Sequence, residues 1–447
     1  MDVIEEVVVP DLPEAENEAA PTPGADTVAG RATRPGPGAE AVPLTVVLDG
    51  GRLRQARELL RAGDPEAAAA LEVLTARADR RLTRGPWSVT DKPQTPPSGD
   101  RHDYLSQAPY WWPGRPRTAA DPEGLPYEQR DGLRNPEVDL ITDHRGRRAM
   151  FDAVQTLALA WYHTGRPDYA ERAAHVLRTW FLDPATRMNP HLAHAQAIPG
   201  ITDGRPIGII DFSQQFTSLL DATALLDTGA PGWSAADRDG MHAWYADFTR
   251  WLGGTFAAEE AATANNHGTF YDMQLAALQL AIGQPESARR TVLAARTARI
   301  DPQIAADGSL PRELARTRSW HYSTFCLVAF TRLALVGRQV GVDLWAYRNP
   351  AGAGIPDAVR HLLPAATGRA PWPHPELDFQ RFAASDVVRA AAEAGDPAAA
   401  EAVPDLQAPP GGDLWPLRPA PEQLDPISGS ARAPVTERPP GREHRRP

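Results

Sequence analysis

The sequence contains one cysteine, Cys326, and therefore cannot form an internal disulfide. Cys326 lies in an apolar stretch, which favours a buried thiol over a reactive nucleophile. The chain also lacks an apolar run of the roughly 20 residues that a membrane-spanning helix needs. Residues 1–20 have neither the basic nor the apolar region of a secretory signal. We therefore expect no membrane association and a cytoplasmic location, or a secreted or periplasmic one if the true start lies upstream.

Positive charge is also scarce, since the formal net charge is -11. Nonspecific nucleic-acid binding needs a broad basic surface, so we expect no nucleic-acid partner, although a local basic cleft remains compatible with this charge. The 42% of hydrophobic residues and the 12 tryptophans are enough for a sizeable core. Nothing in the sequence indicates the oligomeric state.

The two ends of the chain differ from its middle in composition. Residues 1–42 and 418–447 contain no aromatic residue and are rich in proline and alanine or in proline and arginine. Segments of this kind bury too little apolar surface to offset the loss of chain entropy, so we expect both to be disordered. A single domain over residues 43–417 remains between them.

Apolar residues in this central part recur with the spacing of amphipathic helices, whereas the alternation typical of strands is scarce. The sequence therefore predicts an all-α fold. The helical pattern covers residues 53–82, 146–164, 167–182, 211–227, 234–252, 268–282, 285–299, 319–340 and 384–396.

An internal repeat supports this prediction. Residues 165–184 match residues 283–302, with the glycines, the prolines and the closing Asp-Pro in register. In each copy a glycine ends one helix, a proline begins the next and Asp-Pro ends that helix, which predicts a helical hairpin used twice. The separation of the two copies along the sequence favours an (α/α) toroid of hairpins. Two unrelated helical pairs with the same residues at their helix ends would give the same pattern.

Two long segments interrupt the helical pattern, residues 84–145 and 301–318, and long ordered loops are often functional. The first contains Tyr110, Trp111 and Trp112 beside a proline. Three adjacent rings can form a platform for sugar rings, and any one of them can equally plug the end of the helical domain.

The second segment contains three arginines, Arg312, Arg316 and Arg318, and leads into Trp320, His321 and Tyr322. Arginine binds a carboxylate through two hydrogen bonds, and a neighbouring arginine lowers the pKa of a phenol. The alternative is a solvated cluster of arginines paired with neighbouring acids such as Glu313.

The stretch Thr263–Asp272, TANNHGTFYD, places two amides beside an imidazole where a helix begins. We expect Asn265 to cap that helix. An amide can donate to a carboxylate, and a neutral imidazole can hydrogen-bond the same group or remove a proton. With an arginine and a tyrosine, this set suits β-elimination from a uronate, in which the carboxylate is neutralised, the C5 proton is removed and O4 is protonated.

Four separated motifs together resemble the alginate lyase domain family of polysaccharide lyases, with a similarity from about residue 45 to about residue 365. They are residues 88–113, SVTDKPQTPPSGDRHDYLSQAPYWWP; residues 124–137, GLPYEQRDGLRNPE; residues 264–272, ANNHGTFYD; and residues 307–322, DGSLPRELARTRSWHY.

The resemblance implies an (α/α) toroid with a substrate cleft and eliminative cleavage of acidic polysaccharides such as alginate or glucuronan, without a cofactor. It places the catalytic residues at Asn266, His267, Arg316 and Tyr322, with Arg312 or Arg318 sharing the arginine's role. It leaves open whether His267 or Tyr322 is the base, which uronate is cleaved, and whether the cleavage is endolytic or exolytic.

Further residues are candidates for substrate binding rather than for catalysis. Gln214 and Gln215 can bind sugar hydroxyls or form a polar helix face. His191 and His194 have the spacing of a metal-binding pair, but no third ligand stands out, so we expect no metal. The predicted substrate-binding residues are Tyr110, Trp111, Trp112, Gln214, Gln215, Tyr271, Arg312, Arg318, Trp320 and His321.

Two other functions compete with a lyase. An (α/α) toroid can host a glycoside hydrolase, for which acids such as Asp139 and Asp211 would face the centre of the cleft within roughly 10 Å of each other. Asp143 and Asp272 are further acids in the same part of the chain. A noncatalytic uronate-binding protein would keep the aromatic and arginine residues without turning over a substrate.

Overall fold

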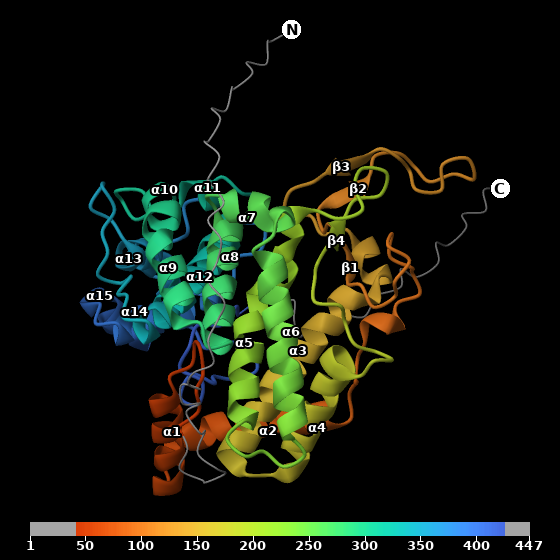
Figure 1. The fold of residues 1–447 in the computed structure, drawn as a ribbon. Coiled ribbons are helices and arrows are strands. Elements are labelled where there is room, and N and C mark those ends of the chain that lie inside the picture. The colour runs from red at the N-terminus through yellow and green to blue at the C-terminus, as the bar shows by residue number, and fades with distance from the viewer. Residues whose placement is uncertain (1–41, 425–447) are drawn as a thin grey trace, which may run out of the picture. The chain divides into compact units, whose positions relative to one another are not determined.

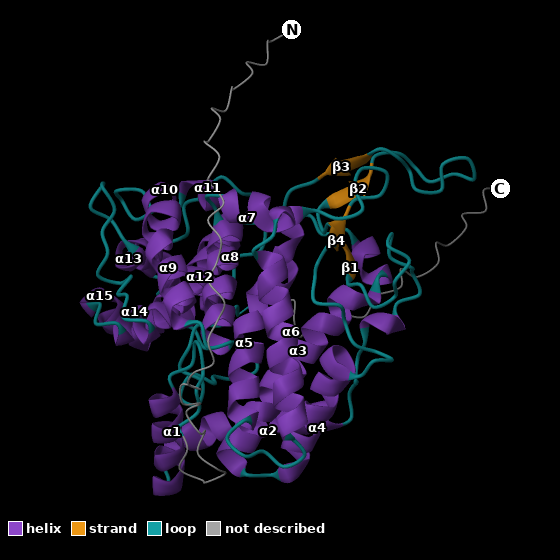
Figure 2. Cartoon of the chain, in the orientation of Figure 1, coloured by secondary structure: helices purple, strands orange, loops and turns teal. Residues whose placement is uncertain are grey.

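The structure is a computed structural model that describes residues 42–424. Helices dominate this part of the chain, as predicted, and none of them is both long and apolar enough to cross a membrane. Strands are short there and lie together at one end of the helices (Figure 2). They are β1 (Leu105–Gln107), which pairs with β4 (His194–Ala197), and β2 (Trp111–Pro113), which pairs with β3 (Tyr127–Gln129).

The helices follow the predicted ranges closely and add short ones that the periodicity did not reveal. They are α1 (Gly50–Ala62), α2 (Pro65–Leu82), α3 (Thr142–Thr164), α4 (Pro167–Leu177), α5 (Ile210–Leu226), α6 (Ala235–Leu252), α7 (Ala258–Ala262), α8 (Asn266–Ala281), α9 (Pro285–Ala295), α10 (Asp301–Gln303), α11 (Pro311–Leu314), α12 (Ser319–Gln339), α13 (Ile355–Ala366), α14 (Ser385–Glu393) and α15 (Pro397–Ala402).

Four inner helices, α3, α5, α8 and α12, pack side by side in this order. In Figure 1 all four begin at the upper end, near the strands, α7 and α11. Residues near their other ends meet the segment before α1: Asp221 of α5 accepts main-chain N–H groups from Val46 to Leu48, and Gln339 of α12 donates to the Val46 carbonyl. Since outer helices such as α4 and α9 alternate with them along the chain, the predicted (α/α) toroid is confirmed.

The predicted repeat is present as the hairpins α3–α4 and α8–α9. A glycine with positive φ ends the first helix of each, Gly165 at 74° and Gly283 at 77°, a backbone conformation that favours glycine. Each outer helix then widens into a π-helical turn, Arg178–Leu182 or Arg296–Ile300. The copies differ at their ends, because the second continues as α10 from Asp301, where the sequence predicted a stop.

The single helical range predicted for residues 53–82 is two helices in the structure. Gly63 adopts φ of 79° after α1, and the Asp64 side chain accepts the Ala67 N–H to cap α2. The Asp-Pro pair that follows the glycine therefore begins a helix here, as an aspartate cap before a proline commonly does.

The boundary predicted at residue 417 is too early. Glu422 accepts hydrogen bonds from Gln155 of α3, Ser218 of α5 and Arg332 of α12, at 2.9, 2.8 and 2.8 Å. The segment 418–424 therefore joins three inner helices, and Arg418, which is buried, pairs with Asp386 of α14. Its composition suggested disorder, but buried polar groups on those helices supply its partners. The rest of that tail, 425–447, and residues 1–41 of the N-terminal segment lie outside the described residues.

Replacing Glu422 with alanine leaves the guanidinium of Arg332 buried without its carboxylate. We expect Glu422→Ala to lower the free energy of unfolding by about 3 kcal/mol, measured by urea denaturation. Glu401→Ala, at an exposed position on α15, is the matched control. Equal stability of the two variants would show that Glu422 does not join the inner helices.

Candidate active site

The TANNHG stretch forms the start of α8. The Asn265 side chain accepts the main-chain N–H of His267 at 3.0 Å, so this asparagine caps the helix as predicted. Asn266 and His267 then occupy the first helical turn. Their side chains are held by two acids that lie outside α8 and far from each other in the sequence.

Asn266 is held by Glu313 of α11. Its main-chain N–H and its Nδ2 each donate to the Glu313 carboxylate at 2.8 Å. Asn266 is 1% exposed, and its Oδ1 has no hydrogen-bond partner among the described residues. One Nδ2 hydrogen remains for a further acceptor, since a side-chain amide carries two.

His267 is held by Glu260 of α7, with 3.0 Å between Nδ1 of His267 and Oε1 of Glu260. The His267 side chain is 20% exposed, whereas that of Glu260 is buried. Burial, assisted by the positive charges of Arg205 and Arg316, lowers the pKa of His267 to about 4. The imidazole is therefore neutral at physiological pH.

The glycine of NNHG lies where no side chain fits. A Cβ on Gly268 would lie 2.1 Å from the Thr263 carbonyl oxygen and 2.5 Å from Nη1 of Arg299. Arg299 donates to the carbonyls of Thr263 and Ala261 and forms an ion pair with Asp272 of α8 at 2.7 Å. This arginine ties the loop before α8 to the helix, so the glycine allows the close packing that positions His267.

Arg316 lies against the ring of Tyr322, with 3.8 Å from its guanidinium carbon to the ring centroid. Its Nε donates to Asp131 at 2.9 Å, and Asp131 also accepts the Thr317 N–H and hydroxyl. Although burial alone would raise it, these hydrogen bonds hold the pKa of Asp131 below its ordinary value. Asp131 is therefore an anion that fixes Arg316 against Tyr322.

The Tyr322 hydroxyl lies 2.8 Å from the hydroxyl of Tyr110. Burial and this neighbour raise the pKa of Tyr322 well above its usual value, while Arg316 acts in the opposite direction. Tyr322 is thus a neutral phenol that can give a proton, and the arginine on its ring favours the phenolate that forms when it does.

The first turns of α8 and α12 are adjacent. One turn after His267 and Tyr322, the rings of Phe270 and Phe325 pack with centroids 4.2 Å apart. The structure therefore brings Asn266, His267, Arg316 and Tyr322 to one end of two neighbouring helices. An amide, an imidazole, a guanidinium and a phenol in such an arrangement can neutralise a carboxylate and transfer protons beside it.

The three adjacent rings of the predicted sugar platform lie in different surroundings. Tyr110 contacts Tyr322 as described, and Trp111 packs on a small cluster that includes Tyr127. Trp112 donates its Nε1 to the Leu133 carbonyl at 2.8 Å and has Arg130 5.4 Å from its ring centroid. Among these rings, the structure links Tyr110 directly to the proposed catalytic residues.

Other predicted binding residues are committed to packing or to structural bonds. Trp320 is 1% exposed and donates to the Gln380 carbonyl, and Tyr271 donates to the Leu252 carbonyl at 2.7 Å. Arg318 faces Glu376 across 3.8 Å, and the His321 main chain donates to the same acid. These contacts place the four residues in the framework around the site.

Three more predicted residues lie at or near the surface of the helices. Arg312 is exposed on α11, in the segment that leads to Arg316. Gln214 and Gln215 are half-buried in α5, and the Gln214 carbonyl accepts a hydrogen bond from Arg332. Of the three arginines, Arg316 is the one that lies over the ring of Tyr322.

The acids of the hydrolase alternative are already engaged. Asp139 accepts two hydrogen bonds from Arg134 at 2.8 and 2.7 Å. Asp211 is buried and accepts from Ser106 and Gln196 at 2.6 and 2.9 Å. Although burial opposes it, His144 and the other donors hold the pKa of Asp211 well below its usual range, so Asp211 does not suit a general acid.

His191 and His194 share a partner, Asp103, whose oxygens lie 2.9 and 3.7 Å from their Nε2 atoms. Within residues 42–424, no group of three or more His, Cys, Asp or Glu side chains is placed to hold a metal ion. The two histidines therefore lie against the same acid in a loop.

Sequence reasoning missed two acids that support the site, Asp131 and Glu260, and it named a third, Glu313, only as a possible partner of the arginines. Asp131 and Glu313 lie within the motifs quoted above; Glu313 directly follows Arg312, whereas Asp131 is 185 residues from Arg316 and no local signal joins the two. Glu260 lies in an alanine-rich run, and no local pattern distinguishes it from the exposed Glu259.

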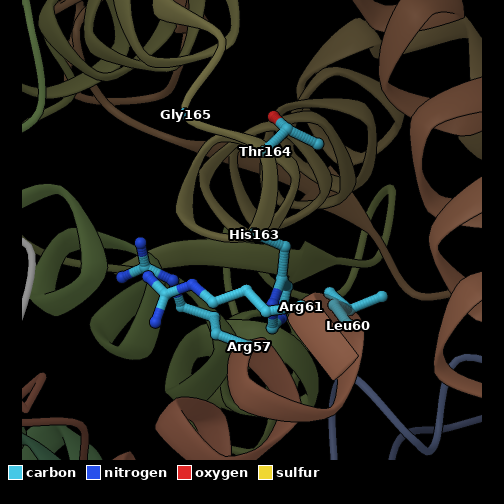
Figure 3. A pocket seen from close by; sticks show the side chains of 6 residues that line it. All are labelled: Arg57, Leu60, Arg61, His163, Thr164 and Gly165. Atoms are coloured by element: carbon cyan, nitrogen blue, oxygen red, sulfur yellow. The ribbon is translucent and has the colours of Figure 1, made fainter. Parts of the chain in front are cut away.

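A surface pocket of about 390 Å³ lies away from these residues, between α1 and the end of α3 (Figure 3). Its polar groups have other contacts, since His163 Nε2 lies 3.2 Å from the Leu417 carbonyl oxygen and Arg57 lies over the Tyr162 ring. No predicted site residue lines this pocket. Its lining residues are Arg57, Leu60, Arg61, His163, Thr164 and Gly165.

Comparisons with known proteins find a family and similar structures. The alginate lyase family model matches residues 88–372. The structure is similar to an alginate lyase from Bacteroides ovatus, with 34% identity, a TM-score of 0.79, and coverage of 85% of this chain and 100% of that one. A search of curated proteins finds no match.

The fold also resembles alginate lyase A1-III from Sphingomonas species A1, with 18% identity, a TM-score of 0.51, and coverage of 85% of this chain and 98% of that one. A variant of A1-III complexed with a tetrasaccharide gives 18% identity, a TM-score of 0.52, and coverage of 85% and 97%. At this identity the likeness concerns the fold alone.

The packing of Gly268 gives a direct test of how the site is held. Gly268→Ala forces Thr263 or Arg299 to move, and we expect the free energy of unfolding to fall by about 1–3 kcal/mol. Thermal unfolding measures this change. Gly253→Ala is the control, because its Cβ would meet its nearest atom at 3.5 Å. An alanine at 268 that is tolerated as well as one at 253 would contradict the close packing described here.

Proposed function

Because the chain belongs to the alginate lyase family and is a polysaccharide lyase, we propose that it cleaves uronate-containing polysaccharides or oligosaccharides by β-elimination. The substrate class is that of alginate, polymannuronate or glucuronan, and the product carries a C4–C5 double bond at its new end. The proposed residues need no cofactor, since side chains alone neutralise the carboxylate.

In the proposed reaction, Asn266, His267 and Arg316 surround the uronate carboxylate at the cleavage site. Tyr322 gives a proton to O4 as the C4–O4 bond breaks. The C5 proton leaves to a base, either the Tyr322 phenolate or His267, and its electron pair forms the C4–C5 double bond. Donors aimed at the carboxylate stabilise the charge that develops after proton removal.

The observation that carries this proposal is the placement of Arg316. Its guanidinium lies on the Tyr322 ring while Asp131 holds it in place, and it acts electrostatically on His267. One cation that lies over a phenol ring and also lowers the pKa of an imidazole suits a reaction that combines carboxylate neutralisation with proton transfer.

The proposal predicts that the protein releases products with the ultraviolet absorbance of an unsaturated uronate from polymannuronate, polyguluronate or glucuronan. Tyr322→Phe removes the transferable proton, and we expect the rate to fall by about 10²–10⁴-fold. Tyr347→Phe, which removes a hydroxyl bonded to Asp301, is the control.

Two other outcomes would overturn a lyase assignment. New reducing ends without the absorbance would indicate a hydrolase, and tight binding with neither product would indicate a noncatalytic uronate-binding protein. Full activity of Tyr322→Phe would remove this tyrosine from the proposed mechanism.

A further inference from the structure

Glu260 and His267 form a pair whose proton arrangement decides what the histidine can do. The carboxyl group lies on α7, which covers the start of α8 (Figure 1), and Oε1 is 3.0 Å from Nδ1 of the imidazole. Glu260 is 0% exposed. No motif or family resemblance drew attention to this acid.

Two proton arrangements fit this contact. If Glu260 is ionised, Nδ1–H donates to it, and the other ring nitrogen, Nε2, carries a lone pair and can act as a base. If Glu260 is a neutral acid, its hydroxyl donates to Nδ1, and Nε2 carries a hydrogen that it can donate. The partner of Nδ1 therefore determines whether His267 removes a proton or binds an anion.

We propose that Glu260 is a positioning residue that, as a neutral carboxylic acid, donates its proton to Nδ1 of His267 and thereby fixes Nε2–H as a donor to the substrate carboxylate. This inference rests on the proposed function, because it assigns one of the two roles left open for His267.

The other oxygen of Glu260 supports the neutral form. Oε2 is buried and has no hydrogen-bond partner among the described residues. The Ile210 main-chain N–H and Arg205 favour a negative charge on the carboxyl group, but the burial of Glu260 outweighs them. A proton on Oε2 would lack an acceptor, so the proton is most stable on Oε1, between the acid and the imidazole.

The charged neighbours of the pair also favour a neutral Glu260. Asp211 of α5 is ionised and repels a second negative charge, as does Glu259 on α7 itself, and Arg205 before α5 is the cation that opposes them. Burial and Asp211 raise the pKa of Glu260 well above its ordinary value. Burial of His267 and the charges of Arg205 and Arg316 disfavour an imidazolium, and they outweigh the Ile207 main chain and Asp211, which favour it.

The consequence for catalysis is a division of roles. With a hydrogen on Nε2, His267 can neutralise the carboxylate together with Asn266 and Arg316, but it has no lone pair to accept the C5 proton. Tyr322 must then first lose its own proton to solvent, which Arg316 on its ring favours, so that the phenolate takes the C5 proton and the phenol formed in this way gives that proton to O4. This arrangement suits uronates in which the C5 hydrogen and O4 lie on the same face of the ring, as in mannuronate and glucuronate.

Glu313 provides an internal contrast, because it accepts from two N–H donors of Asn266. A glutamine at 313 would place an NH₂ group against one of these donors. A glutamine at 260 would instead mimic the neutral acid, since its NH₂ can donate to Nδ1. The same substitution is therefore expected to have opposite effects at the two positions.

The test compares the wild type, Glu260→Gln, Glu260→Ala and Glu313→Gln by the rate of unsaturated product formation from acid to alkaline pH. We expect Glu260→Gln to retain most of its activity near neutral pH, and Glu260→Ala and Glu313→Gln to lose about 10²-fold. Glu401→Gln, at an exposed acid on α15, is the control.

The pH profile adds a readout that a structural role would not change. The raised pKa of Glu260 means that the required proton is present at low pH and is lost as the pH rises through that pKa. Glutamine cannot lose it. The ratio of wild-type to Glu260→Gln activity should therefore fall at alkaline pH, and effects of Tyr322 cancel in this ratio. A constant ratio, with Glu260→Gln as inactive as Glu260→Ala, would overturn the proposal.

Two measurements separate this inference from the proposed function. His267→Gln keeps a side-chain N–H, so it should be at least about tenfold more active than His267→Ala; equal loss would favour histidine as the base. Nitrogen NMR of the His267 ring reports the tautomer without any substrate. A protonated Nδ1 would overturn the inference even if the protein is a lyase, and a protonated Nε2 would support it even if no polymer is cleaved.

Discussion

The site depends on one constraint, which is that the inner helices of the toroid all begin at the same end. Hairpins impose this direction. Each outer helix brings the chain back to the end at which the inner helices begin, so the next inner helix starts there as well. His267 and Tyr322 both lie in a first helical turn, as does Asp211 of α5. Residues far apart in sequence thus meet, and the partial positive charge of several helix N-termini favours an anionic substrate.

Each residue assigned to the carboxylate is supported by a buried or half-buried acid from another segment: Asn266 by Glu313, His267 by Glu260 and Arg316 by Asp131. The acids fix the direction in which each donor points, as supporting residues do in other polar sites. Asp131 also offsets the positive charge of Arg316 when no substrate is bound. A site built from donors alone would carry buried positive charge whenever the substrate is absent.

The helices and the hairpin repeat were predictable because both depend on local signals. These are the amphipathic spacing of apolar residues and the glycine and proline that end one helix and begin the next. The four proposed catalytic residues were identifiable because their motifs are short and continuous. Glu260 was not, since its role arises from α7 folding over α8, which no local pattern encodes. The order of residues 418–424 could not be predicted for the same reason. Their composition favours disorder, while Glu422 is held by three helices that come much earlier in the chain.

That segment also has a consequence for how the protein is made. Glu422 joins α3, α5 and α12, which leave the ribosome well before it does. The hairpins can form in order during synthesis, because their contacts are local. The centre of the toroid, however, is completed only after residue 422 has been made, so a chain that ends before it would keep its outer packing while leaving the buried Arg332 without its acid.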